Sequence, residues 1–167
     1  MTFSDTSTSR RRGAMLILGI LIAICLLFFV FTAKGQSPVS MKMNAGIVTP
    51  KLQETKKFYQ DVLGFGVVFE NDFYLLMHTP NHQAELSFLL PDHPSQQAVF
   101  QPAFSGRGVF LTIEVPDVEA MYKKMKALSI PIVVELREEP WGDRHFAIQD
   151  PAGISIDIVT YTASKSD

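Results

Sequence analysis

Residues 47–69 read IVTPKLQETKKFYQDVLGFGVVF, and residues 113–135 read IEVPDVEAMYKKMKALSIPIVVE. The two stretches align without a gap, so that Pro50 falls on Pro116 and Val62 falls on Leu128. Each begins with a short apolar run and continues with apolar residues at helical spacing. The chain therefore contains one supersecondary unit twice, and such repeated units usually bury a common core.

Each unit predicts the order β-α-β-β-β, because alternating apolar runs flank one amphipathic helix. In the first unit the predicted strand, helix and three strands are 45–48, 50–62, 67–70, 73–78 and 84–90. In the second unit they are 109–115, 117–128, 132–137, 144–149 and 154–160. The stretch 91–107 is rich in Pro, Gln, Ser and Gly without periodicity, which predicts a linker. The expected fold class is α+β, with helices outside a curved sheet cavity.

The strands alternate almost strictly between apolar and polar residues. In the last predicted strand, Ile154, Ile156 and Ile158 alternate with Ser155 and Asp157. The apolar rows are expected to lie under the helices. The opposite face is expected to carry Asn44, Glu85, Ser87, Thr112, Glu114, Ser155 and Asp157. This face either meets solvent, as in many antiparallel sheets, or lines a cavity that the two units share.

A separate apolar segment precedes the repeats. Residues 14–33 contain no charge and are long enough to cross a membrane as a helix. Arg10, Arg11 and Arg12 precede this segment, which places residues 1–13 in the cytoplasm and the following chain outside it. The alternative is a cleaved signal peptide, with secretion of the remainder, because Ala33-Lys34-Gly35 is a small-x-small site. Residues 34–42 are a linker, and 162–167 are a tail.

The remaining composition restricts the partners. Acidic residues outnumber basic residues beyond residue 40, which argues against nucleic acid as a partner. Cys25 is the only cysteine and lies in the apolar segment, so residues 43–161 have no disulfide. The expected partners are a small molecule, a membrane through residues 14–33 and a second copy of the chain in a homodimer.

Two motifs give the chain a family resemblance. They are Phe58-Tyr59-x-x-Val62-Leu63-Gly64-Phe65 and Asp150-Pro151-Ala152-Gly153-Ile154-x-Ile156-Asp157. With the paired units, they resemble the vicinal oxygen chelate superfamily, which includes glyoxalase I, bleomycin-resistance proteins and extradiol dioxygenases. The resemblance covers residues 43–161, with modules at 43–90 and 109–161.

The resemblance implies a divalent metal held by four strands, commonly through two His and two Glu residues. Aligned on the motifs, those positions are Asn44, Glu85, Phe110 and Asp157. Phe110 offers no donor atom, and both imidazoles that a borderline metal prefers are replaced. We therefore expect no cofactor. A weakly held hard cation on Glu85, Asp157 and Asn44 is the alternative.

Several side chains remain as candidates for ligand binding or catalysis. Glu85 and Asp157 are equivalent in the two modules, so they are either an acid–base pair across the cavity or two solvated carboxylates. Trp141 and Arg144 suit an anionic or aromatic ligand. The alternative pairs Arg144 with Asp143 or Glu139. Asn44, Phe110 and Thr112 complete the expected substrate-binding set. His78 and His145 are expected to be structural, and His82 and His93 to be solvated.

Three functions are consistent with these residues. The first is a membrane-tethered domain that binds a small molecule in the cavity between its modules, without the usual metal. The second is a lyase or isomerase with an altered metal site that uses Glu85 and Asp157. The third is a partner-binding module without catalysis.

Overall fold

The structure is a computed structural model, and it describes residues 41–161. From Met43 onward the chain forms one compact unit. The predicted membrane segment at 14–33, the basic segment before it and the tail at 162–167 lie outside the described residues and stay predictions. Within residues 41–161, no helix is both long and apolar enough to cross a membrane.

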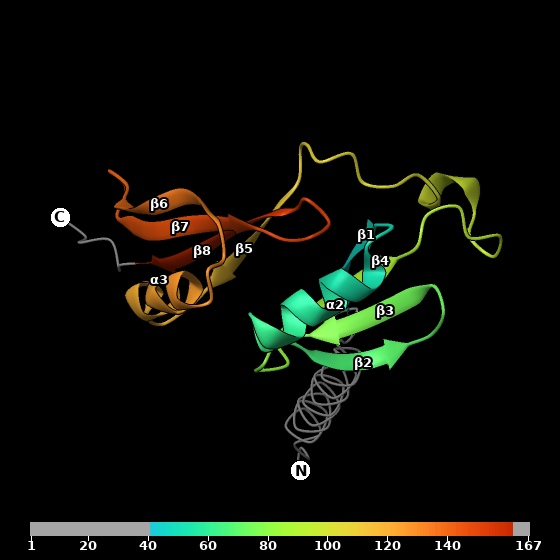
Figure 1. Ribbon diagram of the computed structural model, residues 1–167, viewed down its shortest axis with the longest axis horizontal. Helices are drawn as coiled ribbons and strands as arrows, with labels where there is room; N and C mark the ends of the chain where they lie inside the picture. The colour runs from blue at the N-terminus through green and yellow to red at the C-terminus, as the bar shows by residue number, and fades with distance from the viewer. Residues whose placement is uncertain (1–40, 162–167) are drawn as a thin grey trace, which may run out of the picture. The chain divides into compact units, whose positions relative to one another are not determined.

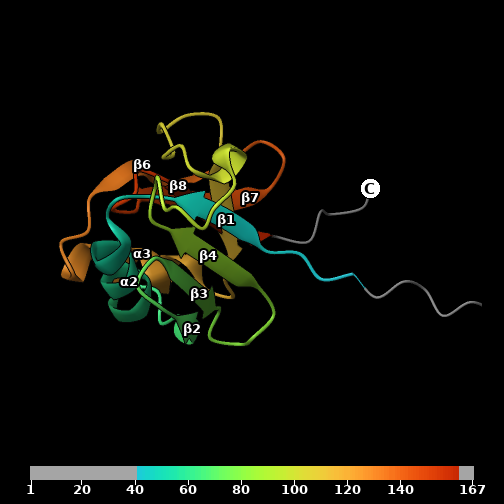
Figure 2. The ribbon, with the colours of Figure 1, turned by 90° about the vertical axis from the view of Figure 1, so that its right-hand side faces the viewer.

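The first module contains one helix and a four-stranded mixed sheet. Its elements are β1 (Ala45–Val48), α2 (Leu52–Asp61), β2 (Gly66–Glu70), β3 (Tyr74–His78) and β4 (Glu85–Leu89). The strand order is β1-β4-β3-β2, as Figure 2 shows, with β1 parallel to β4 and the other neighbours antiparallel. Helix α2 lies along one face of this sheet (Figure 1).

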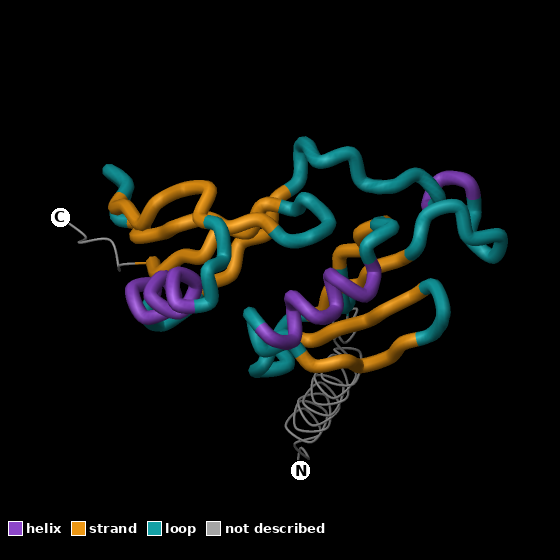
Figure 3. The backbone as a smooth tube through the Cα atoms, in the orientation of Figure 1, coloured by secondary structure: helices purple, strands orange, loops and turns teal. Residues whose placement is uncertain are grey.

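The second module repeats this arrangement. Its elements are β5 (Phe110–Glu114), α3 (Val118–Ala127), β6 (Ile132–Glu138), β7 (Asp143–Gln149) and β8 (Ser155–Tyr161). The order β5-β8-β7-β6 matches the first sheet, again with one parallel pair. The predicted β-α-β-β-β order is thus confirmed. A long connection joins the modules (Figure 3), and its short 3₁₀ helix, η1 (Ala98–Phe100), was not predicted.

Local chemistry fixes where the two helices begin and end. The side chain of Asp117 accepts a hydrogen bond from Ala120 N at 2.8 Å, which caps α3. Glu119 lies in its first turn and Lys124 and Lys126 in its last, as the helix dipole favours. In α2 the cap residue Lys51 has no such bond. Gly64, with φ +76°, adopts a left-handed conformation and ends that segment.

The core follows the predicted apolar rows. Leu75, Met77 and Phe88 are fully buried in the first module, as are Phe146, Ile148, Ile156 and Ile158 in the second. Tyr59 of α2 packs its ring against Phe65 and Phe88, with centroid separations of 5.2 Å and 5.0 Å. The opposite row of β8, Ser155 and Asp157, is only partly buried. The alternation therefore separates a core face from a partly open face in each sheet, although Ser87, Ala147 and Val159 on the second face are also buried.

The two family-like motifs meet in a buried hydrogen bond between the modules. The hydroxyl of Tyr59 donates to Asp150 Oδ2 at 3.0 Å, and Ile154 N donates to Asp150 Oδ1 at 2.8 Å. Burial raises the pKa of Asp150 above its usual value, and burial followed by the Asp150 charge raises the pKa of Tyr59. Lys124 Nζ adds a second link by donating to Val62 O at 2.8 Å.

Candidate functional site

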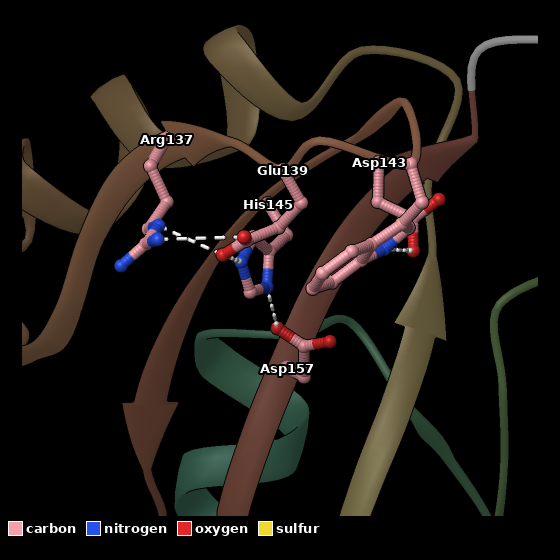
Figure 4. Close-up of polar contacts among 6 residues, drawn as sticks. Arg137, Glu139, Asp143, His145 and Asp157 are labelled. Carbon is pink, nitrogen blue, oxygen red and sulfur yellow. Dashed lines mark hydrogen bonds and ion pairs between the residues drawn. The ribbon is translucent and has the colours of Figure 1, made fainter.

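A histidine between two carboxylates occupies the open face of the second module. His145 Nδ1 lies 2.6 Å from Asp157 Oδ1, and His145 Nε2 lies 3.1 Å from Glu139 Oε1. Arg137 adds a further ionic contact, because its Nε lies 2.8 Å from the same Glu139 oxygen. Figure 4 shows His145 between the two carboxylates, with Arg137 on the far side of Glu139. The side chains of His145 and Glu139 are 19% and 11% exposed, so water competes little for these contacts.

Strand register explains why these residues meet. In β7, Phe146 and Ile148 are buried, so His145 and Ala147 point to the opposite, open face. Ala147 pairs with Asp157 of β8, which makes His145 the diagonal neighbour of Asp157. Glu139 follows β6 in a tight turn, where Glu139 N donates to Asp143 O at 2.8 Å. Three consecutive chain segments thus deliver one residue each.

The two carboxylates favour the protonated imidazole. Partial burial lowers the pKa of His145, but the hydrogen bonds to Asp157 and Glu139 and their charges outweigh burial and raise it overall. With both ring nitrogens donating, one imidazolium is held between two anions. The raised pKa therefore favours a proton on His145, beside Asp157.

A groove of about 490 Å³ lies beside this cluster. It is lined by Gly106, Arg107, Gly108, Val109, Phe110, Ala147, Ser155 and Asp157. Phe110 is 65% exposed, which is unusual for a large apolar side chain on a strand. The groove therefore combines an apolar surface with one cationic and one anionic side chain.

The structure brings only some of the predicted site residues together. Phe110 and Asp157 line the groove, and Thr112 pairs with Asp157 across β5 and β8. Glu85 lines a different cavity, of about 110 Å³, together with Thr112. Asn44 is exposed just before β1. The predicted carboxylate pair, Glu85 and Asp157, thus lies in two cavities rather than one.

Trp141 and Arg144 lie apart from each other as well. Trp141 is 67% exposed, and its Nε1 donates to Asp143 Oδ2 at 2.8 Å. Arg144 is in register with the buried Phe146, so it points toward α3 and pairs with Glu119 there. The expected Trp141–Arg144 ligand pair is therefore not assembled. Neither alternative partner of Arg144, Asp143 or Glu139, is the one observed.

The four positions implied by the family resemblance do not fit a metal ion. Phe110 has no donor atom, and one oxygen of Asp157 already accepts from His145. Glu85 lines a separate cavity from Asp157. Across residues 41–161, no three His, Cys, Asp or Glu side chains are placed to hold a metal together.

Sequence reasoning missed two residues of this site. The sequence predicts a structural role for His145, because no partner lies at metal-ligand spacing from it. Its partner is instead diagonal across β7 and β8, and the register that makes them neighbours is visible only once the strands are paired. Arg107 was assigned to the linker, although it lines the groove beside Phe110.

The family comparison agrees with this architecture. Residues 43–158 match the model of the Glyoxalase/Bleomycin resistance protein/Dioxygenase superfamily. The chain belongs to this superfamily. A comparison with curated proteins gave no match.

Solved structures of the same fold are similar over most of the chain. A lactoylglutathione lyase from Agrobacterium tumefaciens is 22% identical with a TM-score of 0.61, over 74% of this chain and 96% of that one. A glyoxalase/bleomycin resistance protein/dioxygenase from Nocardioides is 17% identical with a TM-score of 0.63, over 84% and 96%. TnmS3, an antibiotic-binding protein from a Streptomyces species, is 19% identical with a TM-score of 0.60, over 76% and 100%. These likenesses establish the superfamily fold.

Proposed function

We propose that this superfamily domain binds a small molecule in the groove on the open face of its second module, without a metal ion. The observation that carries the proposal is the pair Phe110 and Asp157. The first presents an exposed ring at a position where relatives commonly place a metal ligand, and the second is hydrogen-bonded to His145. A ring and a fixed carboxylate bind organic ligands better than metal ions.

The similar proteins support a role in binding small molecules. One of them is a lactoylglutathione lyase and another is an antibiotic-binding protein. The groove volume of about 490 Å³ lies within the range of drug-sized sites. Binding without catalysis is the simpler proposal, because Glu85 does not line the same cavity as Asp157.

The test uses the full chain purified in detergent and a panel of planar aromatic compounds. Trp141 is the only tryptophan and is 67% exposed, so its fluorescence is one readout of binding, and the melting temperature is the second. We expect some compounds to quench it and to raise the melting temperature, with no requirement for divalent ions. Phe110→Ala should weaken binding, whereas Phe100→Ala, which removes an exposed ring in η1, should not. Tight stoichiometric metal, or no response to any compound, would overturn the proposal.

Catalysis is the second candidate, and the contacts of His145 with Asp157 and Glu139 are the observation that favours it. An imidazolium beside Asp157 can hold a proton next to a bound ligand. A lyase or isomerase of this kind would turn over its ligand, and His145→Gln would abolish turnover while leaving binding in place. Product analysis of each bound compound separates this from the binding role. A partner-binding module is the remaining alternative, and an absence of any small ligand would favour it.

The tether and the homodimer are proposals as well. We propose that residues 14–33 anchor the chain with residues 43–161 outside the cytoplasm, and membrane fractionation with protease protection tests this. A soluble product that begins near Gln36 would instead indicate signal-peptide cleavage. Each sheet has one face that is partly open in a single chain, and we propose that a second copy covers such a face in a homodimer. Light scattering in detergent measures the oligomeric state.

A further inference from the structure

The groove combines charges of both signs, and we infer that its ligand is dipolar. In this inference, which rests on the proposed binding role, Arg107 binds an anionic group of the ligand and Asp157 binds an amine. The apolar frame that joins the two groups lies over Phe110. The chemical class is therefore an amino acid-like or aminoaryl acid-like zwitterion.

Arg107 is available to an anion. Within residues 41–161 its guanidinium takes part in no hydrogen bond or ion pair, although it lines the groove. Guanidinium stays charged at any physiological pH and binds carboxylate through two parallel hydrogen bonds. Arg107 is exposed at the groove, so all of its donors are open to a ligand anion.

The backbone on both sides of Arg107 is specialised. Gly106 and Gly108 have φ values of +82° and +83°, a conformation that other residues adopt rarely. A side chain at either position would meet nothing within 4 Å, so space does not require these glycines. The positive φ angles require glycine at both positions, and these angles set the direction in which the chain enters β5 beside the groove.

Asp157 is available to an amine on one side only. Its Oδ1 accepts from His145, while its Oδ2 has no hydrogen-bond partner in the part of the chain that the structure describes. The bond to His145 fixes the orientation of the carboxylate without consuming both oxygens. A ligand ammonium therefore meets an oriented acceptor with one oxygen unused.

Arg107 and Asp157 line the same groove, so one small molecule can contact both. Thr112 pairs with Asp157, and Arg107 precedes Thr112 by five residues. Five extended residues span at most roughly 17 Å between Cα atoms, which sets an upper limit on the separation of Arg107 from Thr112. Phe110 lies between Arg107 and Thr112 in the sequence and lines the groove as well. Probes with frames of two lengths therefore test the separation of the two charges.

The neighbouring charges do not change this assignment. The Glu139 carboxylate contacts Arg137 at 2.8 Å and His145 at 3.1 Å, so two cationic side chains of the protein already surround it. A ligand with only an anion makes no charge contact with Asp157, and a ligand with only a cation makes none with Arg107. Each singly charged ligand thus lacks one of the two charge contacts that the zwitterion makes.

The experiment measures affinity by ligand-observed NMR with the full chain in detergent. The probes are para-(aminomethyl)benzoate, its methyl ester, its N-acetyl derivative and the neutral compound that carries both modifications, each also on a longer biphenyl frame. We expect the zwitterion of at least one frame length to bind about tenfold more tightly than its singly charged forms. Arg107→Gln should reduce it to the affinity of the ester, and Asp157→Asn to that of the N-acetyl derivative.

Matched controls remove the same charges elsewhere. Lys123→Gln and Asp72→Asn each delete one exposed charge outside the groove, and neither should change the order of affinities. Equal binding of the neutral probe and the zwitterion would overturn the dipolar ligand while leaving small-molecule binding intact. Failure of every probe, together with no response in the aromatic panel, would overturn the proposed function as well.

Discussion

The two modules share their topology but not their open faces. Each has a parallel pair, two antiparallel pairs and one helix over its buried row. On the open face of the second module, Glu139, His145 and Asp157 form a charged cluster. On the open face of the first, Phe69 packs near Tyr74 at 6.2 Å, and the His78 ring stacks on His82 at 3.7 Å. The buried residues of the two modules are similar in kind, whereas the residues on their open faces and in the adjoining turns differ.

The modules also contribute unequally to the contact between them. Tyr59 of α2 reaches Asp150, whereas the equivalent position in α3 is Met125, which has no hydroxyl. Met125 is fully buried like Tyr59 and serves only packing. Two polar contacts thus join the modules, Tyr59–Asp150 and Lys124–Val62 O, and only the first is fully buried. The rest of the shared core is apolar.

The largest effects are expected when the Tyr59–Asp150 contact is broken, first by Tyr59→Phe. This change leaves Asp150 Oδ2 without its hydroxyl donor in a buried position, which should lower the free energy of unfolding by about 1–3 kcal/mol. Asp150→Ala should cost at least as much, because Ile154 N also loses its acceptor. Urea denaturation followed by circular dichroism measures both.

Tyr122→Phe is the matched control for that prediction. The hydroxyl of Tyr122 donates to Glu135, but Glu135 is exposed, so water replaces the lost bond. We expect a change below about 0.5 kcal/mol. Equal effects of the two substitutions would show that the Tyr59–Asp150 contact has no special role in joining the modules.

The strands, helices and buried rows of each module were predictable from the sequence, because they follow from the spacing of apolar residues. Ile156 and Ile158 lie two residues apart on a strand, so their burial follows from alternation alone. The Tyr59–Asp150 bond was not predictable, although both motifs were recognised, because it joins residues 91 positions apart. The same limit applies to His145 and to Arg144. The face on which Arg144 lies follows from the exact register of β7, and a shift of one residue reverses it.

Gly66→Ala tests the open face of the first module. A Cβ at this position would lie 2.2 Å from His78 Nε2, so the ring has to rotate away and leave its stack on His82. The second module has Ile132 at the equivalent position. We expect a loss of about 0.5–1.5 kcal/mol, the usual cost of an unfavourable side-chain rotamer.

A double-mutant cycle identifies the cause of that loss. If the clash with His78 is responsible, Gly66→Ala should cost little in a His78→Ala background. Urea denaturation of the two single variants and the double variant gives the coupling energy. An unchanged cost in that background would place the strain in the β2 backbone instead.

A small effect on stability should come from His145, and its size depends on pH. The pKa of His145 is raised in the folded chain, so the folded state binds this proton more tightly than the unfolded state. The stabilisation is therefore fully present below about pH 6.5, the ordinary histidine value, and is lost as pH rises through the raised pKa. Partly solvated ion pairs contribute up to about 1 kcal/mol, so the unfolding free energy of the wild type should exceed that of His145→Gln by less than this at pH 6. The difference should shrink toward pH 8.

NMR titration of the imidazole gives the pKa of His145 directly, and Glu139→Gln should lower this pKa by removing one of the two anions. A difference that grows with pH would mean that His145 is neutral in the folded chain, and the second module would then lack the charge that distinguishes its open face from that of the first.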